Sequence, residues 1–179
     1  AVELLGNEAI YYHQKNNSGF LLNTLNLESD LTRESLRYMY RLLFLFYIES
    51  RPELGFIPSK SQAFIKGYSL ETLRDLELMP LLTDSDKNGY FFDESIKLYF
   101  DMIFNGAEDK GTVWSGRKKA FSIAPLKSHL FDPEKTPLLN KVKLRNHIWQ
   151  EIIQSLSLSK EQKGRNQRGR ISYANLGIN

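Results

Sequence analysis

The sequence has 179 residues and a mass of 20.8 kDa, which suggests one domain because domains typically contain about 100–200 residues. It contains no cysteine, which excludes a disulfide scaffold, a cysteine nucleophile and a thiolate metal site. The longest apolar run, residues 42–48, is far shorter than the ~20 residues that cross a bilayer, and no signal peptide is evident. We therefore expect a soluble, cytoplasmic domain with no membrane partner.

The two parts of the chain carry opposite charge. Residues 1–109 contain 10 basic and 17 acidic side chains, a balance of −7, whereas residues 110–179 contain 14 basic and 4 acidic ones, a balance of +10. Such asymmetry indicates that the basic part meets a polyanion while the acidic part faces water or another protein. A solvated basic surface without a partner remains the alternative.

Apolar residues at helical spacing predict a helix over residues 2–14 and a stronger one near 32–51. Thr32 suits the N-cap of the second helix, and Pro52 ends it. We expect this helix to lie at the centre of the domain. Its predicted buried positions are Leu36, Met39, Tyr40, Leu43, Phe44, Tyr47 and Ile48.

Two further helices follow in the first 110 residues. Ser69 is the expected N-cap of a helix over 70–78, and Asp93 is the expected N-cap of a helix over 94–105. The polar segment 84–89 between them ends in Asn-Gly and predicts a turn.

Residues 106–137 are rich in glycine and proline. Short alternating stretches on both sides of Ser115-Gly116 favour a small hairpin. After this region, Asn140 is the expected N-cap of a last helix that reaches about Leu156. The predicted fold class is therefore mainly α: a single helical domain with a small irregular or β-hairpin insertion near 106–137.

Catalytic motifs are largely missing from the sequence. It has no glycine-rich phosphate loop, no G-x-S-x-G elbow and no paired histidines at metal-binding spacing. One nuclease hypothesis remains: Glu108 and Lys110 form an E-x-K pattern, and Asp93 or Asp101 lies upstream, so these groups would hold a divalent ion. A solvated loop is the simpler interpretation of the same residues.

A group of basic and aromatic residues is more informative. Cationic side chains neutralise phosphates, and an aromatic face stacks on bases or sugars. We therefore predict contact with double-stranded DNA, against the alternative of a flexible basic loop whose tryptophan folds into the core. The predicted DNA-binding residues are Trp114, Arg117, Lys118, Lys119, Lys141, Lys143 and Arg145.

Three stretches resemble one protein family: LRYMYRLLFLFYIESRPELG at 36–55, GYSLETLRDLE at 67–77 and RISYANLGIN at 170–179. Together they resemble the helical region ahead of the catalytic domain in type IIG-like restriction–modification DNA adenine methyltransferases and related phage-defence methylases. In that family the last stretch resembles the lead-in to a Q-x-G-x-x-Y-E segment, after which the methylase core begins.

The resemblance implies a bacterial parent enzyme and a non-catalytic part of it. The family's methyl-donor motif, F-x-G-x-G, and its catalytic N-P-P-Y have no match here. We therefore expect no catalytic residue, no metal and no cofactor in this chain, with S-adenosylmethionine bound by the parent. The other hypothesis, of a different class, is a protein–protein scaffold of a defence complex that never touches DNA.

The expected organisation is a helical accessory or connector domain over 1–158, followed over 159–179 by a basic linker and a lead-in to the methyltransferase domain, which is the expected partner. Residues 171–179 are too apolar for a free tail. Without the methylase core we expect them either to fold back on the domain or to bind a neighbouring molecule.

Overall fold

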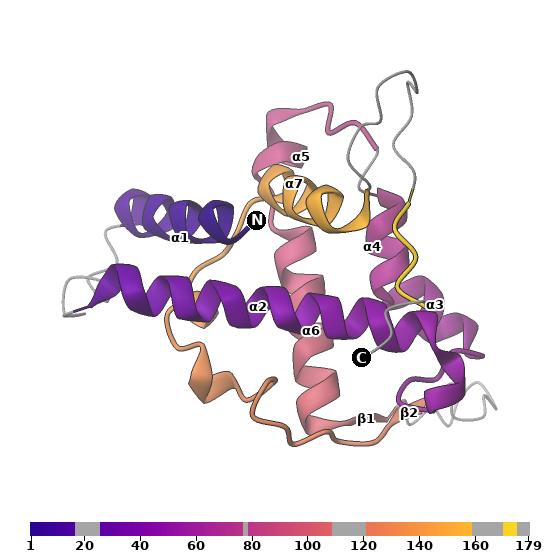
Figure 1. Ribbon diagram of the computed structural model, residues 1–179. Helices are drawn as coiled ribbons and strands as arrows, with labels where there is room; N and C mark the ends of the chain where they lie inside the picture. The colour runs from indigo at the N-terminus through magenta and orange to yellow at the C-terminus, as the bar shows by residue number, and fades with distance from the viewer. Residues whose placement is uncertain (17–25, 77–78, 109–120, 159–169, 175–179) are drawn as a thin grey trace, which may run out of the picture.

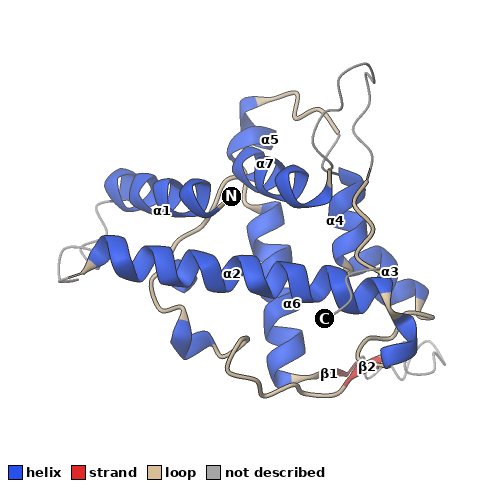
Figure 2. Cartoon of the chain, in the orientation of Figure 1, coloured by secondary structure: helices blue, strands red, loops and turns tan. Residues whose placement is uncertain are grey.

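The computed structural model describes residues 1–16, 26–76, 79–108, 121–158 and 170–174. These residues are mainly helical with a small antiparallel hairpin (Figures 1 and 2), which confirms the predicted fold class. The elements are α1 (Val2–Asn16), α2 (Leu27–Ser50), α3 (Gln62–Gly67), α4 (Leu70–Leu76), α5 (Asp84–Asn88), α6 (Phe91–Asn105), β1 (Ala107–Glu108), β2 (Ser122–Ile123) and α7 (Asn146–Ser157).

Helix α2 forms the centre of the domain, as predicted, and crosses in front of α6 in the view of Figure 1. It begins at Leu27, five residues before Thr32, the predicted N-cap, and no side chain caps it. Tyr38 of α2 is fully buried and lies edge-on to Phe100 of α6, with ring centroids 5.3 Å apart. Aromatic pairs in this geometry add to the apolar burial that joins the two helices.

Part of the predicted buried face of α2 is open to solvent. Leu36 is 42% exposed and Tyr40 is 60% exposed, whereas Leu42 and Leu45 are fully buried. The spacing of apolar residues predicted the position of the helix correctly. However, the helix carries apolar residues on faces that no other element covers. The prediction that Leu36 and Tyr40 lie in the core is therefore wrong.

Two short helices were not predicted from the sequence. Helix α5 occupies the predicted turn at 84–89 and begins with a capping box, in which Thr83 and Asp86 each bond the backbone N–H of the other. Helix α3 begins after Ser61, whose hydroxyl accepts a hydrogen bond from the backbone N–H of Phe64. Helices of five and six residues are too short to show a hydrophobic period.

The predicted N-cap of α6 has a different role. Helix α6 begins two residues before Asp93, and the side chain of Asn146 accepts a hydrogen bond from the Phe92 backbone N–H at 3.1 Å. Asp93 is instead buried and accepts a hydrogen bond from the indole N–H of Trp149 at 3.1 Å. This contact ties α6 to α7.

The last helix begins later than predicted. The predicted N-cap, Asn140, lies in a 3₁₀ turn over Leu139–Lys141, and α7 starts only at Asn146. The amide of Asn140 bonds the hydroxyl of Tyr38 and the carbonyl of Pro133, so it serves tertiary contacts rather than a helix end. The intervening residues 142–145 are not helical.

The hairpin follows α6 directly. Ala107 pairs with Ile123 and Glu108 with Ser122, a register centred on the predicted turn at Ser115, although residues 109–120 lie outside the described part of the chain. Gly106 permits this turn from helix to strand because its φ is +79°, and a Cβ there would lie 2.9 Å from the Ile123 carbonyl oxygen.

Candidate functional site

Most of the predicted DNA-binding loop lies outside the described residues. This holds for Trp114, Arg117, Lys118 and Lys119, so their part in DNA binding stays a prediction. Lys141 lies in the 3₁₀ turn before α7 and is exposed.

The other two predicted residues form ion pairs with the acidic part of the chain. The guanidinium of Arg145 binds both carboxylate oxygens of Glu8 in α1, at 2.6 and 2.8 Å, and lies 3.9 Å from the ring centroid of Tyr11. Lys143 binds Glu94 of α6 at 2.8 Å. Glu8 is 3% exposed and the Arg145 side chain is 18% exposed, so the Arg145–Glu8 pair is partly shielded from water, and it joins α1 to the start of α7.

The nuclease hypothesis receives no support from the placement of its described residues. Asp93 lies near the first turn of α6 and Glu108 lies beyond the last, so about 20 Å of helix separates them. Asp101 accepts a hydrogen bond from Asn105 at 2.6 Å. Lys110 is outside the described residues, and within the described ranges no group of three or more histidines and carboxylates is placed to hold a metal ion.

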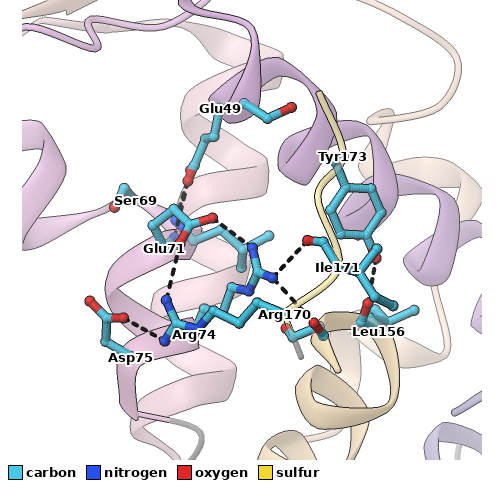
Figure 3. A network of polar contacts seen from close by, with 12 residues as sticks. Glu49, Ser69, Glu71, Arg74, Asp75, Leu156, Arg170, Ile171 and Tyr173 are labelled. Atoms are coloured by element: carbon cyan, nitrogen blue, oxygen red, sulfur yellow. Dashed lines mark hydrogen bonds and ion pairs between the residues drawn. The ribbon is translucent and has the colours of Figure 1, made fainter. Parts of the chain in front are cut away.

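Buried charges gather instead around α4 (Figure 3). The carboxylate of Glu49, near the end of α2, accepts hydrogen bonds from the first backbone N–H groups of α4, at Leu70 (2.7 Å) and Glu71 (3.0 Å). The hydroxyl of Ser69 accepts a further one from the Thr72 N–H at 3.3 Å, as predicted for an N-cap. Burial raises the pKa of Glu49 to about 7, because a carboxylate loses hydration there.

Arg74 links α4 to two distant parts of the chain. It is 6% exposed and donates to the carbonyl of Ser157 at 3.2 Å and to the carbonyl of Ile171 at 2.8 Å, while its other terminal nitrogen binds Glu71 at 2.9 Å (Figure 3). Its guanidinium also lies 5.5 Å from the ring centroid of Phe46 in α2. One buried cation thus joins α2, α4, α7 and the C-terminal segment.

Residues 170–174, the C-terminal segment, pack on the domain. Tyr173 is 5% exposed and stacks on Phe46, with ring centroids 5.0 Å apart and planes at 7°, and its hydroxyl donates to the Leu156 carbonyl at 2.6 Å. The Ile171 N–H donates to the Ser157 carbonyl at 2.7 Å. These residues were expected either to fold back on the domain or to bind a neighbouring molecule. In the structure they fold back on the domain. Residues 170–174 therefore contact the helical domain directly.

A second set of buried charges lies on the inner face of α2. The Glu34 carboxylate accepts hydrogen bonds from the backbone N–H groups of Leu138 (3.0 Å) and Leu139 (2.8 Å). Arg41, two turns later, donates to the carbonyls of Leu130 (2.7 Å) and Asp132 (2.9 Å). Burial raises the pKa of Glu34 and lowers that of Arg41. Both side chains hold the irregular segment that follows the hairpin.

These contacts share one chemical character. Glu34, Arg41, Glu49 and Arg74 each bind backbone groups of a segment far away in the sequence, so their charges fix the fold. Sequence reasoning missed all four, although Glu34 and Arg41 do fall at helical spacing with the buried Tyr38 and could have been identified by that position.

Comparison with known proteins adds no assignment: no family model, characterised protein or solved structure matches the chain. None of the helices in the described ranges has the length and apolar character needed to cross a membrane.

Proposed function

We propose that this chain is a non-catalytic helical support domain of a restriction–modification DNA adenine methyltransferase. Its role is to hold the polypeptide that leads to the catalytic domain in a fixed position. The observation that supports this proposal is the hydrogen bond from the guanidinium of Arg74 to the backbone carbonyl of Ile171. Ile171 lies in the stretch 170–179 that resembles the family's lead-in to the methylase core.

The buried charges agree with a support role. Chemical catalysis needs titratable groups that converge on a space open to a substrate. Here the buried carboxylates of Glu34 and Asp93 and the half-buried carboxylate of Glu49 are bonded to backbone N–H groups, to an indole and to a lysine. In the proposed parent, S-adenosylmethionine and the reacting adenine bind to the catalytic domain, as the resemblance implies.

The proposal includes DNA phosphate contact through Arg117, Lys118, Lys119 and Lys141. The alternative, a scaffold domain that contacts only protein, is favoured by one specific observation. Lys143 and Arg145 are bound to acidic residues of the same chain, so two of the predicted cations already have counter-charges.

A salt titration of duplex DNA binding distinguishes these two functions. If four cations contact phosphates, a plot of the logarithm of the DNA-binding constant against the logarithm of the salt concentration should have a slope of about −4. We expect the triple variant Arg117→Ala, Lys118→Ala, Lys119→Ala to bind more weakly and to reduce this slope to about −1. Fluorescence anisotropy with a labelled duplex measures both values.

The matched control is Lys143→Ala, which removes a cation that is bound to Glu94. It should leave the slope within experimental error of the wild type. Absence of binding at low salt, or a slope near zero, would contradict the DNA-contact proposal and support the protein-only scaffold.

A further inference from the structure

A pocket of about 230 Å³ lies between α2, α6 and the irregular segment after the hairpin. Four nearly buried side chains line it: Tyr38, Arg41, Phe100 and Phe131 are between 0% and 4% exposed. Three of them carry aromatic rings and the fourth carries a positive charge. The remaining lining residues are Lys97, Asp101, Phe104, Pro133 and Asn140.

The charge of Arg41 is only partly compensated. Its Nε and one terminal nitrogen, Nη2, donate to backbone carbonyls, while Nη1 has no hydrogen-bond partner among the described residues. Asp132 and Glu34 act on the guanidinium through space, but neither forms an ion pair with it. A buried cation held by neutral carbonyls and aromatic rings favours a nearby anion.

A second cation faces the same space. Lys97 binds Asp93 at 2.8 Å and also donates to the Val142 carbonyl, which leaves one of the three hydrogens of its ammonium group for another acceptor. Asp101 is the one carboxylate among the lining residues, and it is exposed. The lining thus carries two positive charges and one negative charge.

The aromatic lining restricts what kind of anion fits. Phe100, Phe104 and Phe131 offer ring faces and edges to a flat apolar body. An engineered cavity of about 150 Å³ accepts benzene in another protein, so the present volume suits one ring with one small substituent.

We propose that this pocket binds a small one-ring aromatic carboxylate. Its carboxylate faces the cations of Arg41 and Lys97, and its ring lies against Phe100 and Phe104. This site is independent of the proposed support function, because it involves neither the C-terminal segment nor the predicted DNA loop.

Calorimetric titration of the whole chain with benzoate, benzyl alcohol and inorganic phosphate tests the proposal. Benzoate should bind with one-to-one stoichiometry and at least about tenfold more tightly than benzyl alcohol, since the alcohol lacks the charge. Phosphate should bind at least about tenfold more weakly than benzoate, because it lacks the ring. Equal affinity of benzoate with either of the other two, or benzoate binding without saturation, would overturn the proposal.

Two substitutions locate the ligand without touching the buried floor of the pocket. Asp101→Asn removes the exposed carboxylate and should tighten benzoate binding about threefold, and Phe104→Ala should weaken it about tenfold. Asp75→Asn, on α4, is the matched control and should change nothing. If circular dichroism shows intact folds and both pocket variants bind benzoate like the wild type, the ligand lies elsewhere and the proposal is wrong.

Discussion

Replacement of Arg74 by methionine should lower the free energy of unfolding by about 2–3 kcal/mol. Methionine keeps most of the apolar stem but removes every hydrogen bond of the guanidinium. The carbonyl of Ile171 would then lose its buried donor, and the carbonyl of Ser157 would keep only the hydrogen bond from the Ile171 N–H. An unpaired buried carbonyl is costly. Chemical denaturation followed by circular dichroism measures the change.

The matched control for this variant is Arg170→Met. Arg170 binds Asp75 at 2.7 Å and lies 3.9 Å from Glu71, but its side chain is 44% exposed. Exposed ion pairs contribute at most about 1 kcal/mol, so this variant should stay close to the wild type. Equal losses in the two variants would mean that burial of Arg74 does not dominate the network.

The stability of the domain should fall as pH rises from about 4.5 to about 7. The folded state raises the pKa of Glu49 from 4.5 to about 7, so within this window the folded state binds a proton that the unfolded state has released. Deprotonation therefore favours unfolding as pH rises. The pKa values of Glu34 and Asp93 are raised by burial as well, and their contributions have the same sign.

Glu49→Gln isolates the largest of these contributions. The neutral amide keeps an oxygen acceptor for the first N–H groups of α4 but does not titrate. Between about pH 5 and pH 8 the variant should lose roughly 2–3 kcal/mol less stability than the wild type. Glu53→Gln, which removes an exposed carboxylate bound to Arg51, should keep the pH dependence of the wild type. Parallel curves for wild type and Glu49→Gln would show that Glu49 does not titrate in this range.

The sequence predicts the long helices well because their signal is local. Helices α2 and α6 contain 24 and 15 residues, enough turns for an apolar period to appear. Local spacing does not reveal which apolar side chains another element covers, and for this reason Leu36 and Tyr40 were placed in the core although they are exposed.

The buried charges could not be predicted because their partners are remote. Arg41 binds carbonyls 89 and 91 positions away, and Arg74 reaches 97 positions to Ile171. From the sequence alone, such residues cannot be distinguished from charged residues on a solvent-exposed helix face. The packing of residues 170–174 on the domain depends on the same remote contacts and could not be located from the sequence. The sequence does show that this segment is apolar.

The support function depends on the C-terminal segment being held by the domain, and the exchange rate of one amide tests this most directly. The Ile171 N–H donates to the Ser157 carbonyl at 2.7 Å, beside the buried Arg74. Native-state hydrogen exchange followed by NMR should show protection of Ile171 similar to that of the core amide of Leu45 in α2. Exchange of Ile171 orders of magnitude faster, with Leu45 still protected, would show that the segment is not held and would contradict the proposed role.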